Sequence, residues 1–546
     1  MSGLRAPHLG PIVGHTTERS CRLWIRAEDP ADRQVELADE RRTIGVVAIL
    51  QVGGKAIPVA KRPIYYFRLR REYDRTGTFN LGIDSSLGSK DKSQSLTPDT
   101  EYRVRLATFA LDDPLPNDID TDDGRLAEKL PPPSVWGEEF DGLSATKCEA
   151  VFRTFGDPNT IQPQLGFLLG SCRYPGVLWQ KREADQIFAP MLSHARNKYA
   201  PAKFVLMVGD QIYADLLNRM VPIGRADSFQ EFQERYHTAF SSTNMRSLLR
   251  HLTTYMILDD HEIEDNWTQD RIKRTGSRQL FMQAIRAYQS YQWSHGPRNF
   301  GSHLYYHFNC DGYPFFVLDT RTQRYVDDIS ESLLDNHLLG RPSHDPVDEP
   351  GQLDFLKHWL SNQQSVWGNV PKFICSSSVF VPNSVDSTKS DKHKLREDSW
   401  SAFPDTRRRL LEHIVGEKIQ NVIFLSGDIH CSNVTTLNFS GVSGSSQLRA
   451  FSITSSAFYW PFPFADGDPA SYVHDSYLEG DTFNFFGDNG AMNYQATNFT
   501  QEDNFCRIDL DQNAGTLTVK VFDWRGEPVR RRDGQNIVST LALAKW

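Results

Sequence analysis

The chain has 546 residues, which is enough for two or three domains and a large hydrophobic core. Hydrophobic residues make up 39% of the chain and charged residues 24%, which is the profile of an ordinary soluble globular protein. The net charge of -9 and the pI of about 6.0 disfavour a nucleic-acid-binding protein, which usually presents a basic face.

The cysteines and the N-terminus favour an intracellular protein. The seven cysteines are odd in number and include no Cys-x-x-Cys pair, so we expect reduced thiols instead of a disulfide framework. The first residues, MSGLRAPHLGPIVGH, lack the apolar core of a signal peptide. Arg41 and Arg42 imitate a twin-arginine signal but lie too far inside the chain. The apolar runs have strand length, so no membrane span is expected. The predicted location is cytoplasmic, although an exported protein whose signal has been removed has the same pattern.

Residues 1–156 are predicted to form an all-β domain. Short β-rich runs are separated by turns, at 21–27, 62–70, 101–109 and 149–155. The stretch LTPDTEYRVRLATF (96–109) resembles the corner motif of fibronectin-type sandwiches. An acidic, proline-bearing insertion near 112–133 interrupts this domain, and we expect it to be a mobile surface loop.

Residues 157–546 are predicted to form an α/β domain, because strands alternate with helices. The expected strands lie at 165–171, 204–210, 254–260, 313–320, 372–378 and 421–428, and the expected helices at 183–195, 280–293 and 407–415. Residues 505–546 return to β structure. The aromatic-rich stretch 456–499 is expected to be a long loop that partly covers the site. Packing of its aromatic side chains against the C-terminal strands is the alternative.

Four of the expected strands end directly before residues that can bind a metal ion. Sites in open α/β sheets form at the carboxyl ends of strands. A single Asp at such an end is explained by helix capping, but four ends with these side chains predict a metal site. Carboxylate, imidazole and related ligands suit iron, manganese, zinc or calcium. The residues are Cys172 after LLGS, Asp210 and Tyr213 in LMVGDQIY, Asp260, His261 and Asn266 in MILDDHEIEDN, and Asp428 and His430 in IFLSGDIH.

These motifs, in this order, resemble those of the PhoD-like (alkaline phosphatase D) family. The family belongs to the calcineurin-like and purple-acid-phosphatase-like class of metallophosphatases. Further similar stretches are LDTRTQR (318–324), GQLDFLKHWL (351–360) and EDSWSAFPDTRRRLLE (397–412), so the resemblance covers nearly the whole chain. It implies an α/β fold in which a metallophosphoesterase β-sheet sandwich is flanked by helices. A fibronectin- or Ig-like β-sandwich domain precedes it.

The resemblance also implies a site with iron(III) and calcium. Carried onto this sequence, Cys172, Asp210, Tyr213 and His430 hold the iron. Asp210 bridges to calcium, which Asp428 and Asn266 also bind. In the wider class an Asn directly precedes the motif histidine, and here that position is Asp260, so either Asp260 or Asn266 faces the metal. Zn2+ or Mn2+ is the alternative cation.

The implied activity is metal-dependent hydrolysis of phosphomonoesters, phosphodiesters or both, with a small-molecule phosphoester as substrate. Two cations lower the pKa of bound water from 15.7 to about 7, so that hydroxide can attack phosphorus. His261 is the candidate general acid. Arg173 and Arg321 are candidate substrate ligands, with a solvated loop charge and an internal salt bridge as the respective alternatives. Asp259 is expected to orient its loop, and Glu262 to be structural.

Other functions have less support in the sequence. GVSGS lacks the spacing of a serine-hydrolase elbow, QVGGKA is no Walker A motif, and His261-Glu-Ile-Glu-Asp is not the zincin pattern. A degenerate or metal-stabilised binding module without turnover is the remaining alternative. The retention of all the expected ligand types argues against it.

Overall fold

The N-terminal region is a β-sandwich. The computed structural model describes residues 3–29, 41–114, 123–176, 182–216, 224–326, 332–384, 398–462, 469–473 and 481–546. One sheet contains β1 (Leu9–Thr16), β2 (Cys21–Arg26) and β6 (Thr76–Leu81), and the other contains β3 (Arg41–Val52), β4 (Lys55–Ala56), β5 (Ile64–Arg68), β7 (Glu101–Pro114) and β8 (Glu149–Arg153). Leu23 of the first sheet shares a buried core with Val47 and Val104 of the second. Alternating apolar residues thus pack two sheets face to face, as expected.

The acidic insertion is partly folded. Its residues 115–122 lie outside the described part of the chain. From Asp123 onward the chain forms α1 (Asp123–Ala127), η4 (Pro133–Trp136), α2 (Glu139–Gly142) and α3 (Ala145–Cys148). Leu126 and Trp136 are each only 2% exposed and share a core with Val46, and the indole of Trp136 donates to the Tyr66 hydroxyl at 2.7 Å. The expectation of a mobile surface loop is therefore wrong for α1, because Leu126 is buried in the core of the domain. Trp136 belongs to the segment that follows the insertion.

The rest of the chain is built on two larger sheets. The six-stranded sheet has the order β11 (Thr253–Met256), β10 (Phe204–Met207), β9 (Gln164–Gly170), β20 (Asn504–Asp511), β21 (Thr516–Asp523) and β22 (Val538–Ala542). The eight-stranded sheet has the order β12 (Tyr306–Cys310), β13 (Tyr313–Val317), β14 (Lys372–Cys375), β15 (Val422–Ser426), β17 (Ala450–Thr454), β16 (Ser432–Ser440), β19 (Gly490–Thr500) and β18 (Phe483–Phe485). Strands β9, β10 and β11 run parallel, as do β13, β14, β15 and β17.

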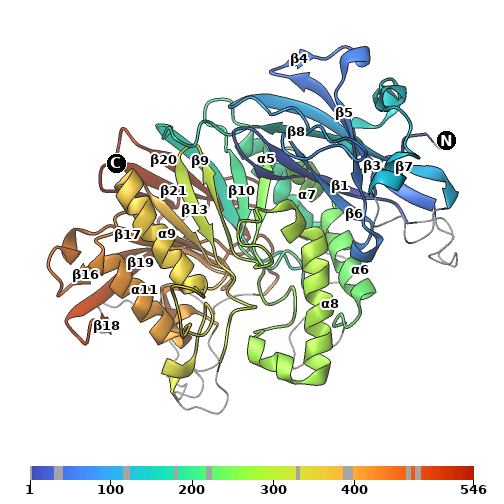
Figure 1. Ribbon diagram of the computed structural model, residues 1–546. Coiled ribbons are helices and arrows are strands. Elements are labelled where there is room, and N and C mark those ends of the chain that lie inside the picture. Colours follow the sequence, from blue (N-terminus) through green and yellow to red (C-terminus); the bar gives the residue numbers. More distant parts are fainter. Residues whose placement is uncertain are drawn as a thin grey trace.

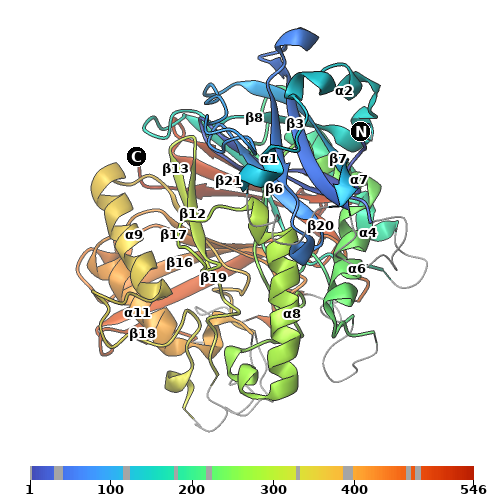
Figure 2. The same ribbon diagram turned by 45° about the vertical axis from the view of Figure 1, so that its right-hand side comes forward.

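Helices cover the outer faces of both sheets. On the six-stranded sheet they are α5 (Phe188–Ala195), α6 (Phe229–Phe240), α7 (Thr243–Leu249) and α8 (Thr275–Tyr291), and on the eight-stranded sheet α9 (Gln352–Trp367) and α11 (Pro404–Gly416) (Figures 1 and 2). In β10, Val205 and Met207 pack under the helices, while Phe204 and Leu206 pack between the sheets. Burial on both faces explains why this strand is continuously apolar. The expected sandwich flanked by helices is confirmed.

Two local expectations need correction. The helix expected at 183–195 is divided at Ile187 into α4 (Glu183–Gln186) and α5. The loop expected at 456–499 contains two strands, β18 and β19. Strand β19 pairs with β16, and β18 pairs with β19 as the edge strand of the sheet. Residues 463–468 and 474–480 of that stretch lie outside the described residues. Among the others, the loop description suits 456–462 at the end nearest to β17.

The N-terminal sandwich packs beside the strands that lead to the candidate site. The hydroxyls of Thr16 in β1 and Thr253 in β11 are 2.9 Å apart. Arg246 of α7 donates to the carbonyl of Gly10 at 2.9 Å, and Trp24 donates to the carbonyl of Ser290 in α8 at 2.8 Å. In Figure 1 this domain lies at the upper right, above α6 and α8. The two regions are therefore joined by buried polar contacts.

Candidate metal centre

The candidate site lies at the carboxyl ends of four strands, as the sequence predicts. Strands β9, β10 and β11 are adjacent and parallel, so their ends meet at one edge, and the end of β15 faces them from the other sheet. The chain turns sharply there. Cys172, Asp210, Asp428 and His430 have φ values of 58°, 56°, 69° and 52°. Left-handed backbone at non-glycine residues costs free energy and is concentrated at functional sites.

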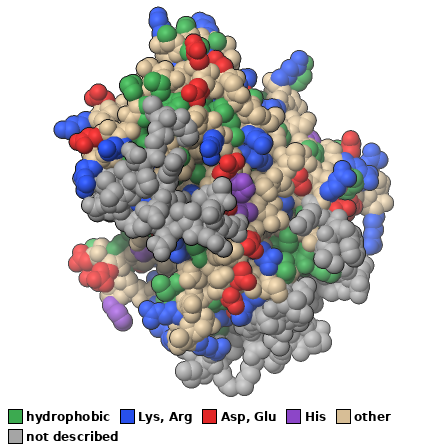
Figure 3. Space-filling model, turned by 90° about the vertical axis from the view of Figure 1, so that its right-hand side faces the viewer, with side chains coloured by type: hydrophobic (Ala, Val, Ile, Leu, Met, Phe, Trp, Pro, Cys, Tyr) green, Lys and Arg blue, Asp and Glu red, His purple; other side chains and the backbone are tan. Residues whose placement is uncertain are grey.

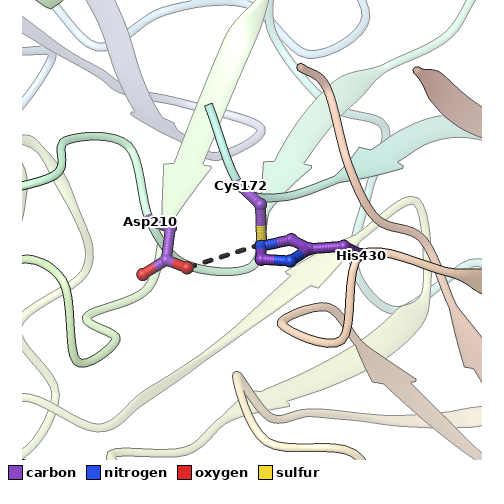
Figure 4. Close-up of side chains that lie close together, drawn as sticks. All are labelled: Cys172, Asp210 and His430. Atoms are coloured by element: carbon purple, nitrogen blue, oxygen red, sulfur yellow. Dashed lines mark hydrogen bonds between the residues drawn. The ribbon is translucent and has the colours of Figure 1, made fainter. Parts of the chain in front are cut away.

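One group of donors combines sulfur, oxygen and nitrogen. Candidate ligand atoms of Cys172, Asp210 and His430 lie within 4.8 Å of one another. The Cys172 thiol donates to Oδ2 of Asp210 at 3.4 Å (Figure 4). The Tyr213 hydroxyl lies 3.4 Å from the same Oδ2 and 3.4 Å from Nε2 of His430. The structure thus brings together the four residues predicted for the first cation.

A second group contains only carboxylates. Oxygens of Asp210, Asp259, Asp260 and Asp428 lie within 4.8 Å of one another, and a third group joins Asp210 and Asp260 to His261. Asp210 belongs to all three groups, which is the position predicted for a bridging ligand. Asp259 was expected only to orient its loop. Its side chain does accept from Arg321 through Oδ1, but it also joins the carboxylate group.

The site carries more negative charge than its described protein partners compensate. Asp210 is fully buried, and its Oδ1 has no hydrogen-bond partner among the described residues, and neither has Oδ2 of Asp259. Burial, and then the nearby acidic groups, raise the pKa of Asp210 and of Asp428 well above the usual range. Burial also raises the pKa of Cys172 to about 12. Unpaired buried oxygens are costly, and bound cations relieve that cost. The residues therefore fit a pair of metal ions.

His261 lies beside the carboxylates and is held by a residue that the sequence analysis did not single out. Its Nδ1 is 2.7 Å from Oδ1 of Asp215, and its ring centroid is 4.3 Å from that of Tyr213. Burial alone lowers the pKa of His261, but the charge of Asp260 and the bond to Asp215 outweigh burial and raise it to about 10. Asp215 also accepts from the amide of Asp265 at 2.6 Å. Its position five residues after Asp210 was the only available signal.

Glu262 connects two of the strand ends. Its carboxylate accepts from the backbone amides of Asp210, Gln211 and Asp259 at 3.2, 2.7 and 2.9 Å. Three backbone bonds to one buried carboxylate hold the turns after β10 and β11 in register. This agrees with the structural role expected for it.

The third motif contains two candidate ligands that contact each other. The backbone amide of Asn266 donates to Oδ2 of Asp260 at 2.6 Å, and its side-chain Nδ2 donates to Oδ1 of Asp265 at 3.1 Å. Asp260 is 3% exposed and belongs to two of the donor groups, while Asn266 is half-buried. Asn266 therefore orients Asp260 through its backbone.

The two predicted substrate arginines are buried. Arg321 is fully buried and pairs with Asp259 and Asp398, so the internal salt bridge given as the alternative is the observed arrangement, and the substrate role is corrected. Arg173 is 4% exposed, and it donates to the carbonyl of Ala184 at 3.2 Å and to the Ser242 hydroxyl at 3.2 Å. These contacts place it in the helix layer. Among the described residues its side chain makes no hydrogen bond or ion pair with the carboxylates of the site, so its substrate role stays a prediction.

Aromatic side chains from the start of the 456–499 stretch line one side of the site. The ring of Trp460 stacks on His430 at a centroid distance of 3.7 Å and an interplanar angle of 19°. Tyr174 meets Trp460 and Tyr213 edge to face at 5.3 and 5.2 Å. Phe462, which also touches this group, is 44% exposed. This segment therefore reaches the ends of β9, β10 and β15, as the expectation of a partial cover requires.

The face of the molecule drawn in Figure 3 carries side chains of both charges. On the side of the molecule shown in Figure 3, acidic and basic side chains are interspersed among the coloured residues. Among its coloured residues, that face shows no broad surface of one charge.

Comparison with known proteins identifies the family. A model of the family described as PhoD-like phosphatase matches residues 177–497, which is more than half of the chain. The chain belongs to this family. The resemblance inferred from the motifs is therefore confirmed.

Relatives of this PhoD-like chain are distant in sequence. Alkaline phosphatase D of Bacillus subtilis (strain 168) is 24% identical over 341 residues, which cover 59% of this chain and 55% of that protein, so the chain spans about half of this curated relative. The solved structure described as "Structure of PhoD" has a TM-score of 0.62 at 16% identity and covers 98% of this chain and 89% of that chain. This structure supports the fold, and the chemistry must be argued from the residues of this chain.

Two general features of the described chain bear on the sequence analysis. All seven cysteines are buried, and no disulfide joins any two of them in the described residues. Among the described residues, no helix has the length and apolar composition needed to cross a membrane.

Proposed function

We propose that this PhoD-like chain is a metal-dependent phosphoesterase whose two cation positions share Asp210. The observation that carries the proposal is that three groups of metal-capable side chains meet at this one carboxylate, while one of its oxygens has no hydrogen-bond partner among the described residues. A carboxylate with two available oxygens can bridge two cations. Two-metal sites of this type stabilise both the attacking and the leaving oxygen of a phosphoryl transfer.

The two positions differ in their donor atoms. Cys172, Tyr213 and His430 offer sulfur, phenolic oxygen and nitrogen beside Asp210, a set suited to iron(III), with zinc as the alternative. Asp260 and Asp428 offer only oxygen, which suits calcium, with manganese as the alternative. Burial lowers the pKa of His430 to about 3, so its imidazole is neutral and can act as a ligand.

Each group of the chain has a distinct role in the proposed reaction. The bound cations supply a Lewis acid for the phosphoryl oxygens and lower the pKa of a water nucleophile. His261 lies beside this position, and Asp215 fixes its ring and its protonation, so His261 is placed to give a proton to the leaving alkoxide. Trp460 covers the face of His430 and limits the access of water to it.

Elemental analysis of the purified, unchelated protein is the first test. Iron and calcium near one equivalent each, together with hydrolysis of a phosphomonoester or a phosphodiester, support the proposal and the assignment of the two positions. Zinc or manganese with the same activity retains the phosphoesterase and rejects the iron assignment. Protein without metal, and without activity after any cation is added, contradicts the proposal and favours the binding module.

Replacement of His261 by Gln tests the general acid. We expect kcat for an alkyl phosphate, whose leaving group needs a proton, to fall by about 10²–10⁴-fold. An aryl phosphate with an acidic phenol needs little protonation, so its kcat should change much less. Equal losses for both substrates contradict a proton-donor role for His261.

A further inference from the structure

A buried arginine lies directly behind the carboxylate group. Arg321 is fully buried, and its Nε donates to Oδ1 of Asp259 at 2.5 Å. Its two terminal nitrogens form a fork on Asp398, with both N–O distances at 2.6 Å. The Nη2 atom of Arg321 also lies 3.4 Å from Oδ1 of Asp260. One guanidinium thus contacts two neighbouring carboxylates of the second cation position and a third carboxylate behind them.

This contact decides which oxygen of Asp259 faces the site. Because Oδ1 is bound by Arg321, Oδ2 is the oxygen left without a hydrogen-bond partner among the described residues. On its other side Asp259 packs on Gly209, where a Cβ atom would lie 2.6 Å from the Asp259 Cβ. Gly209 has a φ of +114°, which disfavours any other residue. Asp259 is therefore held from both sides.

Asp398 fixes Arg321 in turn. It is bound by Arg321 and also by Arg324, whose Nε donates to the carbonyl of Thr320 at 2.9 Å. Burial alone raises the pKa of Asp398, but the two guanidinium groups outweigh burial and hold it well below its usual range. Within the part of the chain that the structure describes, Arg324 makes no hydrogen bond to Asp259 or Asp260. Arg324 is thus a matched control for Arg321.

We propose that Arg321 is a positioning residue for the second cation, orienting Asp259 and Asp260 while Asp398 holds it in place. The inference rests on the proposed two-cation function. A planar guanidinium can bind the carboxylates of Asp259 and Asp398 at the same time, which a lysine ammonium cannot do in the same geometry. Residues that orient metal ligands in this way typically contribute 10–100-fold to metal affinity.

The test measures cation affinity without turnover. Chelator-treated wild type, Arg321→Met, Arg321→Lys and Arg324→Met proteins, reloaded with iron, are dialysed against graded free Ca2+, and iron and calcium are then measured in the same samples. We expect the Kd for calcium to rise at least tenfold in Arg321→Met and in Arg321→Lys. It should stay within about threefold of wild type in Arg324→Met, with iron content unchanged throughout.

Each outcome has a clear meaning. Calcium affinity in Arg321→Met equal to or tighter than wild type overturns the inference, and so does full recovery in Arg321→Lys, which makes charge alone sufficient. Loss of iron and calcium together shows general damage to the site and also counts against a role specific to the second cation. If Arg321→Met does not fold, Asp398→Asn replaces it, with a smaller rise in Kd expected. Wild type that binds neither calcium nor, in the same dialysis with Mn2+, manganese overturns the proposed function itself.

Discussion

Asp74 in the N-terminal sandwich and Asp210 in the metal centre are both buried aspartates, but their surroundings are opposite. Asp74 is bound by Arg26 at 2.7 and 2.9 Å, by His237 at 2.9 Å and by the Tyr291 hydroxyl. Burial alone raises the pKa of Asp74, but these partners outweigh burial and hold its pKa well below the usual range. The pKa of Asp210 is raised, and one of its oxygens has no hydrogen-bond partner among the described residues.

The difference separates a structural charge from a functional one. Asp74 is neutralised by the chain itself, and its network joins β2 to α6 and α8 across the boundary between the two regions. Asp210 lies among other acidic side chains, and its side chain has no ion pair with a cationic side chain among the described residues, which suits a ligand of bound cations. A buried carboxylate with a raised pKa and an unpaired oxygen, within a group of other metal-capable side chains, indicates a functional site.

The largest expected effect comes from Asp210→Asn. The amide cannot bridge two cations, so phosphoesterase activity should fall at least about 10³-fold, given the several kcal/mol that metal ions contribute to such reactions. In the presence of a chelator the variant should unfold at a higher temperature than wild type, because one buried like charge is removed. Assays and thermal unfolding check both parts, and full activity in this variant rules out Asp210 as the shared ligand.

Asp74→Asn should lower stability and leave activity unchanged, which is the reverse of what we expect for Asp210→Asn. Breaking a buried ion pair leaves Arg26 without its carboxylate, so the free energy of unfolding should fall by about 3–5 kcal/mol. Activity per folded molecule should be unchanged below the melting temperature. Denaturant titration with parallel assays measures both quantities. A stable variant with reduced turnover would mean that Asp74 has a functional role and is not a purely structural charge.

Cations should stabilise the metal centre and not the sandwich. At a free Ca2+ concentration of 100 times the Kd, the unfolding free energy of wild type should increase by about 2.7 kcal/mol. The same addition should leave Asp210→Asn nearly unchanged and should stabilise Asp74→Asn as much as wild type. The measurement is urea unfolding with and without calcium, and equal stabilisation of all three proteins points to cation binding elsewhere.

The smallest expected effect concerns His295, a buried group that is neither ion-paired like Asp74 nor part of the metal-capable groups around Asp210. His295 is fully buried, neither ring nitrogen has a hydrogen-bond partner among the described residues, and the metal-capable groups found there do not include it. Burial lowers its pKa from 6.5 to about 3. The folded state therefore binds fewer protons than the unfolded state below pH 6.5, and stability is lost as the pH falls from 6.5 toward 3.

His295→Phe should reduce this acid sensitivity. Because the variant has no imidazole to titrate, the slope of its unfolding free energy against pH should be smaller than that of wild type. The difference should be up to about 1.4 kcal/mol per pH unit between pH 6.5 and 3. Urea titrations of chelated protein at pH 7, 6 and 5 measure the slope for the variant and for wild type. An unchanged slope means that His295 is already charged in the folded protein.

The strand ends could be predicted from the sequence because the signal is local. An apolar strand followed at once by Asp, His or Cys places the donor at a known edge of the sheet, whichever strands are its neighbours. Cys172, Asp210, Tyr213, Asp428 and His430 come together for that reason. The same local reasoning failed for the insertion and for the 456–499 loop. The burial of Leu126 and the pairing of β19 with β16 both depend on residues that are distant in the sequence.

The amino-acid sequence alone was enough to establish the fold class, the family resemblance and the donors at the four strand ends, since each depends on short motifs and their order. The partners of those donors depended on the three-dimensional arrangement. Asp215 meets His261 across 46 residues, and Arg321 meets Asp259 across 62. No local pattern distinguishes an arginine that binds substrate from one that holds a ligand. That choice depends on which carboxylate lies opposite it, and packing of the two sheets brings the carboxylate there.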